Sequence, residues 1–243
     1  MFYLKFIKII LMLFLTTSSF SFDISRTDFD RRMDTGGGYR EVEFTNHSEK
    51  PVRYKFSAIT NDKEKDMSKW VELYPKVMTI PPLEKRTLKI YAKSPKDKPW
   101  GEYSFYLNID TLVVPTIKAT SKGKIVGTTS VSFVPRITMY GYIGETNYEK
   151  NIKFENIKFE TENKKQFILG NIINDGDIGA NLVLRFMGGN EFVLNEKWLG
   201  RIGKNSNQNI KIELDGFKIK DIKELKIYDA NSPNRKIIKT IKL

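Results

Sequence analysis

Residues able to do acid–base, nucleophilic or metal chemistry are scarce in this sequence of 243 residues. It contains no cysteine and one histidine, His47, which lies in the turn-like stretch Asn46-His47-Ser48. A catalytic triad would need this turn residue as its base, and no G-x-S-x-G sequence presents a serine nucleophile. A metal site built from His and Cys ligands lacks its ligands. The sequence therefore predicts a protein that is not an enzyme and that holds no metal or other cofactor.

Two further patterns have a chemical and a structural interpretation. The glycines 36–38 are not followed by Lys-Ser/Thr, so they are not a phosphate loop and instead predict a hairpin turn between the first two strands. The acidic residues of 62–66 alternate with lysines, and Asp175 and Asp177 lack the full calcium loop with its bidentate Glu. We interpret Asp175-Gly176-Asp177 as a tight turn.

The aromatic and basic residues raise the question of a nucleic-acid or carbohydrate partner. The formal net charge is +12, but the lysines alternate with apolar residues and form no single block. A stacking platform needs aromatic side chains on one exposed sheet face beside a basic groove. Tyr103 and Phe105 alternate with Ser104, as in a sandwich core, and we expect Trp70, Trp100 and Trp198 to be core residues too. No nucleic-acid partner is predicted.

The first 21 residues have the parts of a cleavable secretory signal. Lys5 and Lys8 precede the apolar run 9–15, small polar residues follow at positions 16–19, and Ser19 and Ser21 suit cleavage after Ser21. The run is far shorter than the ~20 residues that span a bilayer, although an uncleaved anchor is the alternative. No Cys follows it, which excludes a lipoprotein anchor. We predict a signal peptide at residues 1–21, an exported, periplasmic protein without stable membrane insertion, and a mature charge of +10 once Lys5 and Lys8 are removed from +12.

The rest of the chain alternates between apolar and polar residues with period two, which predicts half-buried strands. The clearest stretches are residues 40–45, 52–56, 87–91, 102–109, 129–133, 167–172, 180–186, 210–214, 225–228 and 236–241. Pro, Gly, Asn and Asp clusters separate them at the spacing of a β-sandwich, and at most one helical turn is expected, near residues 63–70. A polar stretch at residues 144–147 is the best domain boundary. We predict an all-β chain of two immunoglobulin-like β-sandwich domains in tandem, residues 22–143 and 144–243.

Four stretches of the first domain, in this order, resemble the periplasmic chaperones of chaperone–usher pili. They are Phe44-Thr45-Asn46 followed by Lys50-Pro51, the proline-led run 79–90, the strand 99–109 with its Pro-x-x-Glu and Leu-Asn, and the run 131–140. In the second domain, Asn171 to Gly176 resembles that family's N-x-x-G turn. The resemblance implies an N-terminal chaperone domain followed by a C-terminal sandwich in a boomerang-shaped molecule.

The resemblance also implies how such a protein acts. Pilus subunits lack one strand, and the chaperone lends its last first-domain strand to complete them, so that backbones pair and alternate side chains fill a groove. Here Thr129, Val131 and Phe133 have one parity and would form the lending face. This strand is shorter and less apolar than the corresponding strand of many family members.

The family also clamps the carboxylate at the subunit's C-terminus with two basic residues at the cleft between the domains. By resemblance, Arg136 is the candidate that follows the lending strand. For the other, Arg26 fits the local pattern of a basic residue three positions before an aromatic, whereas distance to the glycine turn favours Arg31 or Arg32. Each of these arginines has an alternative interpretation as an exposed surface residue.

Two functions follow as hypotheses. The first is a periplasmic chaperone that binds and stabilises pilus or fimbrial subunits and delivers them for assembly, with an outer-membrane usher as a further partner. It would be monomeric or form one-to-one complexes. The alternative is a secreted structural or adhesive β-sandwich protein of the cell envelope, which would instead polymerise through its strand edges.

Overall fold

A computed structural model describes residues 22–25, 27–61, 65–112, 118–119, 125–126, 134–232 and 234–243. The predicted signal peptide, residues 1–21, lies outside this range. Within it, no helix is long and apolar enough to cross a bilayer. The same residues contain no group of three or more His, Asp or Glu side chains placed to hold a metal ion.

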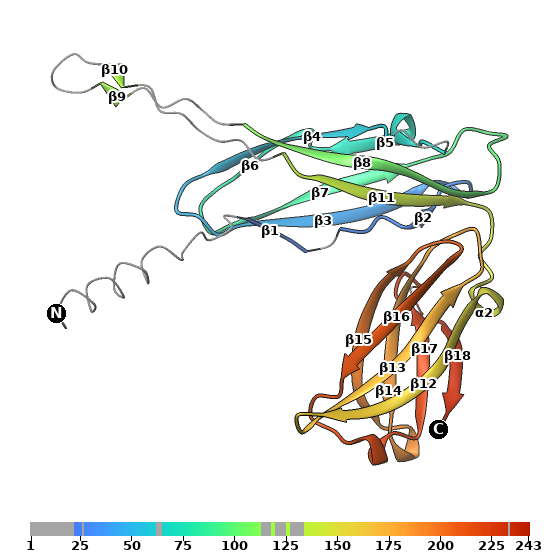
Figure 1. Ribbon diagram of the computed structural model, residues 1–243. Helices are drawn as coiled ribbons and strands as arrows, with labels where there is room; N and C mark the ends of the chain where they lie inside the picture. The colour runs from blue at the N-terminus through green and yellow to red at the C-terminus, as the bar shows by residue number, and fades with distance from the viewer. Residues whose placement is uncertain are drawn as a thin grey trace, which may run out of the picture.

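The first domain consists of two sheets packed face to face (Figure 1). One has the order β1-β3-β7-β5, with bounds β1 Phe22–Ile24, β3 Gly38–Asn46, β7 Lys85–Ala92 and β5 Val71–Tyr74. The other has the order β2-β11-β8-β4-β6, with bounds β2 Arg31–Arg32, β11 Arg136–Ile143, β8 Gly101–Thr111, β4 Val52–Ile59 and β6 Val77–Ile80. A short 3-10 turn, η1 Ser68–Trp70, precedes β5. Because β1 and β2 edge different sheets, the chain crosses the side of the sandwich between them. This strand order is that of an immunoglobulin-like domain.

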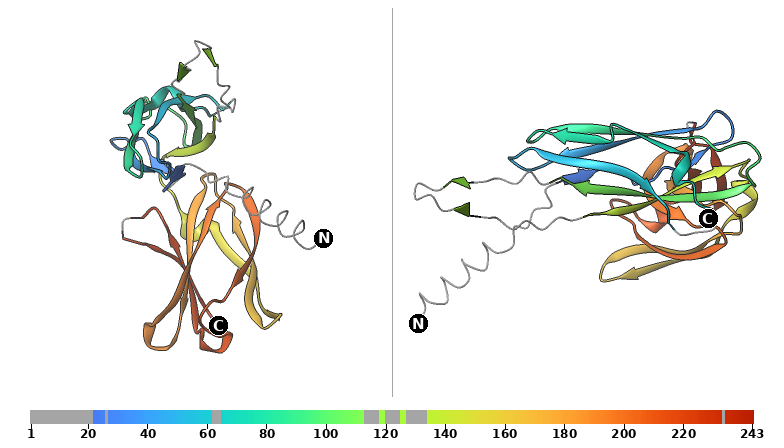
Figure 2. Two further views of the ribbon diagram at one scale, coloured as in Figure 1. Left: turned by 90° about the vertical axis from the view of Figure 1, so that its left-hand side faces the viewer. Right: turned by 90° about the horizontal axis from the view of Figure 1, so that it is seen from above.

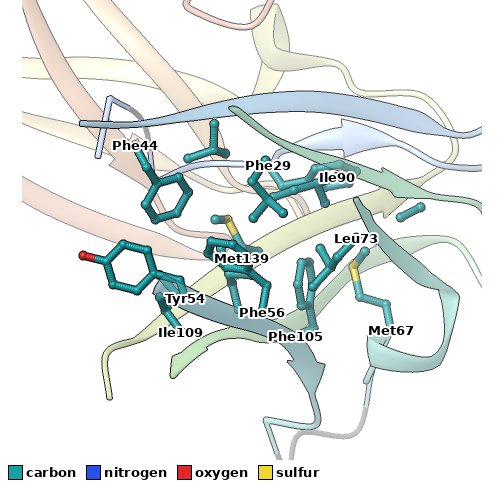
Figure 3. Close-up of a cluster of buried hydrophobic side chains, with 14 of the residues drawn as sticks. Phe29, Phe44, Tyr54, Phe56, Met67, Leu73, Ile90, Phe105, Ile109 and Met139 are labelled. Atoms are coloured by element: carbon teal, nitrogen blue, oxygen red, sulfur yellow. The ribbon is translucent and has the colours of Figure 1, made fainter. Parts of the chain in front are cut away.

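Alternation along the strands fills the core between these sheets. In β3, Val42 and Phe44 are fully buried, while Glu41 before them is exposed and Glu43 between them is half-buried. The aromatic side chains of Phe44, Tyr54 and Phe56 meet at centroid distances of 5.1 to 6.3 Å. Figure 3 shows these rings with their aliphatic neighbours. Burial of one face of each strand is therefore what joins the two sheets.

The second domain is a smaller sandwich of the same kind. One sheet has the order β12-β13-β16, with bounds β12 Ile152–Glu162, β13 Lys165–Asn174 and β16 Ser206–Glu213. The other has the order β15-β14-β17-β18, with bounds β15 Val193–Ile202, β14 Ala180–Met187, β17 Glu224–Asp229 and β18 Ile237–Lys242. Short helical turns are α2 Tyr148–Asn151, η2 Gly189–Glu191 and η3 Ile219–Asp221. A separate apolar core, centred on Leu182, Leu184 and Phe186, lies between these sheets.

Buried asparagines end the corresponding strand of each domain. Asn46, at the end of β3, directs its amide nitrogen at the carbonyl oxygens of Lys50, Ile80 and Pro81, at 2.9 to 3.1 Å. Asn174, at the end of β13, donates to the carbonyl oxygens of Ile178 and Gly203 at 3.0 Å. Both side chains are fully buried, so each amide replaces the backbone pairing that stops there.

The two domains meet at one end of the first and are inclined to each other, as in an L (Figures 1 and 2). β11 runs toward this junction and ends there at Ile143. The two-residue strands β9 Lys118–Ala119 and β10 Ile125–Val126 pair antiparallel beyond the opposite end of the first domain.

The prediction of an all-β chain with two immunoglobulin-like sandwiches is confirmed. The boundary at residues 143 and 144 stays a prediction. Two expectations are wrong. The glycine turn at residues 36–38 connects β2 to β3 across the two sheets and is no hairpin. Trp100 and Trp198 are 49% and 65% exposed, because Trp100 covers the glycine of the turn after β11 and Trp198 faces outward from its sheet.

Candidate functional site

One edge of the first domain is open. β11 pairs with β8 along its whole length, from Arg136 to Ile143. On its other side it pairs with β2, and only at Gly141 and Tyr142. Among the residues that the structure describes, no strand pairs with β11 between Arg136 and Met139. This part of β11 is therefore an edge strand.

The backbone groups on this edge point outward in a defined pattern. The carbonyl of Pro135 accepts from the Ile109 amide of β8 at 3.1 Å, whereas the carbonyl of Tyr142 accepts from Met33 beside β2 at 2.9 Å. Because these directions alternate along an antiparallel strand, the backbone N–H and C=O of Arg136 and Thr138 point away from β8. Such groups are a template for pairing with a further strand.

The side chains of β11 alternate in the same way. Met139 is fully buried in the core and Ile137 packs against it. Arg136 is exposed, and its Nε donates to Oδ1 of Asn108 on β8 at 3.4 Å. The edge thus has a fixed, core-anchored inner face and a basic residue at its start.

Four of the five residues predicted to bind a subunit lie outside the described residues: Arg26, Thr129, Val131 and Phe133. The fifth, Arg136, is described, and it is placed by β11. It lies at the start of an eight-residue strand whose other end reaches the junction. It is therefore about 23 Å from Ile143, since a strand rises roughly 3.3 Å per residue. Its assignment as a carboxylate-binding residue stays a prediction.

The junction is instead formed around Arg201 of the second domain. Its guanidinium contacts Asp30 at 3.0 Å and Glu102 at 2.5 Å, both from the first domain. It also lies over the ring of Tyr140 at 3.7 Å. Both carboxylates accept a second bond from the second domain, Asp30 from the Asn181 amide at 2.5 Å and Glu102 from the Gly179 N–H at 2.7 Å. Charge-assisted bonds of this kind fix the geometry of the groups that they join.

Burial decides the electrostatics of this cluster. Asp30 is 5% exposed, and desolvation raises its pKa to about 6 although Arg201 opposes the shift. Burial works to lower the pKa of the Arg201 guanidinium, but Asp30 and Glu102 together raise it above its ordinary value. Arg201 therefore stays charged while Asp30 can take up a proton near neutral pH.

The alternative anchors Arg31 and Arg32 do lie at the junction, but each is already engaged. Arg31 donates to the carbonyl of Tyr39 at 3.2 Å and to that of Asn231, in the second domain, at 3.3 Å. Arg32 forms two bonds with Asp34 at 2.8 and 3.1 Å. Of these contacts, the bond from Arg31 to Asn231 joins the two domains, and the two bonds from Arg32 pair its charge with Asp34.

The sequence interpretation missed Asp30, Arg201 and Glu102 as junction residues. Glu102 was the one with a usable signal, since it is an acidic residue in a central strand that is otherwise uncharged up to Asn108. Asp30 and Arg201 are 171 residues apart, and nothing local to either marks it as half of an ion pair.

Comparisons with known proteins give similar structures only. No protein-family model and no curated protein matches the chain. The E. coli chaperone DraB aligns at 12% identity over 92% of this chain and 95% of its own, with a TM-score of 0.45. The SafB chaperone, in complex with the Salmonella enterica SafA pilin, aligns at 13% identity over 88% of this chain and 91% of its own, with a TM-score of 0.44. The third structure is the CsuC–CsuE chaperone–tip subunit complex from the archaic chaperone–usher pili of Acinetobacter baumannii. It aligns at 16% identity over 79% of this chain and 90% of its own, with a TM-score of 0.40.

Proposed function

We propose that this protein is a periplasmic chaperone of pilus subunits that pairs the free edge of its β11 with the subunit. The observation that carries the proposal is the unpartnered stretch of β11 from Arg136 to Met139 within the described residues. Strand addition to such an edge takes its affinity from main-chain hydrogen bonds and its selectivity from alternate side chains.

Further support comes from the composition and order of the sequence. The four family-like stretches include residues 99–109, most of which lie in β8, the neighbour of β11. The predicted lending residues Thr129, Val131 and Phe133 come shortly before β11 in the chain. A subunit strand that pairs with β11 could therefore extend its pairing to them. Their role, and those of Arg26 and Arg136, stay proposals.

The test removes one outward-pointing donor from the edge. Thr138→Pro deletes the N–H that points away from β8, so the pairing of β11 with β8 keeps its bonds and the fold is retained. The chain is co-expressed with a tagged, exported one-domain pilus subunit, and the subunit recovered from the periplasm is measured. We expect recovery to fall at least about fivefold, as the loss of one edge bond of about 1 kcal/mol implies.

Thr138→Val is the matched control, because it changes the same side chain and keeps the N–H. It should protect the subunit as the parent does, and circular dichroism should show both variants folded. Equal recovery with Thr138→Pro and with the parent would rule out pairing at β11.

The same open edge also supports the alternative of a structural or adhesive envelope protein, since an edge can pair with another copy. Size-exclusion chromatography of the purified chain alone separates the two. A monomer that forms one-to-one complexes with the subunit supports the chaperone, whereas polymers that Thr138→Pro dissolves support the structural protein.

A further inference from the structure

A short apolar row crosses the outer face of the sheet β15-β14-β17-β18. Val183 of β14 pairs with Trp198 of β15 on one side and with Tyr228 of β17 on the other. Residues directly opposite in register share a face of the sheet. This face is the outer one, because the side chains of Leu182 and Leu184, the neighbours of Val183 in β14, are buried in the core. The row therefore belongs to the surface of the second domain.

Trp198 is the member of this row that is open to a ligand. The guanidinium of Arg185 lies over the ring of Tyr228 at 4.4 Å, its Nη1 donates to the Tyr228 hydroxyl at 3.1 Å, and that ring is buried. Trp198, in contrast, is 65% exposed. No ring and no cation of the described residues stacks on its indole. The indole thus presents a flat, unoccupied aromatic surface.

The indole lines a cleft of about 460 Å³ between the two domains. The second domain supplies the row of Val183, Trp198 and Tyr228, and the first domain supplies Ile24 at the end of β1 and Thr27 in the segment that follows. Sites for small molecules are clefts of roughly 300–1,000 Å³ that combine an apolar surface with a few polar groups. The cleft has the size of such a site.

The charges that line the cleft are already paired with one another. Glu196 accepts from Arg185 at 2.7 Å and contacts Arg235 at 3.3 Å. On the wall of the first domain, Asp28 is paired with Arg40. A ligand with a net charge of either sign would meet a like charge beside each opposite one, so it would lose hydration without gaining an unpaired counter-charge. The cleft is therefore suited to an uncharged ligand.

The polar groups around the indole alternate between acceptors and donors. Glu196 is half-buried and Arg235 is exposed, so the carboxylate and the guanidinium keep contact with solvent beside Trp198. On the facing wall, Asn231 accepts from Arg40 through Oδ1 at 2.9 Å, and its Nδ2 has no acceptor among the described residues. A carboxylate only accepts and a guanidinium only donates, whereas a hydroxyl does both. A ligand with several hydroxyl groups matches this alternation.

Two other uncharged ligands fit this surface less well. An extended peptide takes its affinity from main-chain bonds to a strand edge, but the backbones of β14 and β17 are paired on both sides. An aliphatic chain would cover the indole but would also take the charged groups beside it out of water without a hydrogen bond in return.

A pyranose ring has both features that the cleft requires, because C–H groups cover its flat face and hydroxyls surround its rim. We propose that the cleft binds an uncharged glycan, with one pyranose ring stacked on the indole of Trp198 and its hydroxyls hydrogen-bonded to Glu196 and Arg235. The site shares no residue with the open stretch of β11 from Arg136 to Met139. The inference therefore goes beyond the proposed function and does not rest on it.

The test titrates the purified chain with chitotriose and with cellotriose, two uncharged β-linked trisaccharides whose equatorial substituents leave broad C–H faces. Isothermal titration calorimetry measures the affinity, and we expect the parent to bind at least one of them. Trp198→Ala should weaken that binding roughly tenfold, as for a truncated aromatic anchor. Phe192→Ala is the matched control, because it removes another ring of the second domain that is 67% exposed and does not line the cleft. It should bind as the parent does.

A spectroscopic measurement locates the binding at the indole. The tryptophan emission of the parent should shift to the blue when the sugar ring covers Trp198. Trp198→Phe keeps an aromatic ring, so it should retain part of the affinity while the shift disappears, and circular dichroism should show all variants folded. If the parent binds neither trisaccharide, or if Trp198→Ala binds as tightly as the parent, the inference is wrong. Neither result affects the proposed function, because the edge of β11 is not probed.

Discussion

At the scale of the residue, Asn46 shows how the amide of one side chain joins two backbone segments at the end of the first domain. It is fully buried, its Nδ2 faces three carbonyl oxygens, and its Oδ1 accepts from the backbone N–H of Ser48 at 2.9 Å. The turn after β3 and the end of β6 are thus held by one side chain. No other residue type supplies donors and an acceptor from a side chain of this length.

Asn46→Asp should therefore be strongly destabilising although it is isosteric. The carboxylate places a charge without donors against carbonyl oxygens in a buried site, which costs about 3 kcal/mol or more. Urea unfolding monitored by circular dichroism measures the change. Asn209→Asp, on the exposed part of β16, is the control and should cost less than about 0.5 kcal/mol. Similar losses in both variants would mean that the amide of Asn46 has no special role.

At the scale of the element, the short strand β2 determines how much of β11 is open. It has two residues and covers Gly141 and Tyr142. It is held against β3, where the absence of a side chain at Gly38 allows close approach. An added Cβ at Gly38 would lie 2.4 Å from the Cβ of Arg31 and 3.2 Å from the Arg32 carbonyl oxygen.

Gly38→Ala should displace β2, because the Cβ of Arg31 moves only with its backbone. We expect a loss of about 1–3 kcal/mol in the free energy of unfolding, the usual cost of overpacking. Hydrogen exchange should show faster exchange at Met33, whose N–H bonds to the carbonyl of Tyr142. Gly189→Ala, which meets no atom within 4 Å, is the matched substitution and should leave both measurements unchanged. An unchanged stability of Gly38→Ala would contradict the close packing of β2 on β3.

At the scale of the whole molecule, the cluster of Asp30, Arg201 and Glu102 sets how the domains are arranged. Each of its ion pairs crosses the junction, and the two carboxylates are 5% and 7% exposed. A buried ion cluster adds little net stability over apolar packing, but removing one partner leaves an uncompensated charge. Its contribution is to lower the free energy of one relative orientation of the domains below that of other orientations, in which these charges would lose their partners.

The raised pKa of Asp30 predicts a pH dependence with a definite sign. A carboxyl whose pKa is higher in the folded than in the unfolded state contributes stability below its unfolded pKa of 3.8, and this contribution is lost as pH rises through about 6. Asp30→Asn cannot titrate, and Asn tolerates the positive φ of 35° at this position. Relative to Asp30→Asn, the parent should therefore lose about 2 kcal/mol between about pH 4 and about pH 7.

Urea unfolding of both chains across this range measures the difference, in which the titration of other carboxyls cancels. The free energy of unfolding of the variant should rise relative to that of the parent as the pH rises. If the difference in free energy of unfolding stays constant, or if the parent becomes the more stable chain as pH rises, then Asp30 does not lose a proton in the buried cluster over this range.

The sequence by itself determined the class of fold and most of the strands. Alternation depends on each strand burying one face, so it marks β3, β4, β7, β8, β13 and β14 without knowledge of their partners. The same reasoning failed for Trp198, because a period of two says that one face is buried but not which one a single large side chain takes. The role of Arg136 rests on the resemblance alone, which locates the residue in the chain but not its distance from the junction.

Only the tertiary structure decided where the open edge and the domain junction lie. An open edge is a missing partner, and which strands pair depends on contacts between β2, β8 and β11 that are far apart in the chain. The junction likewise depends on Asp30 and Arg201, which are 171 residues apart in the chain. Local sequence determines the direction of a side chain relative to its own strand, whereas the neighbours that it meets follow from the packing of the whole chain.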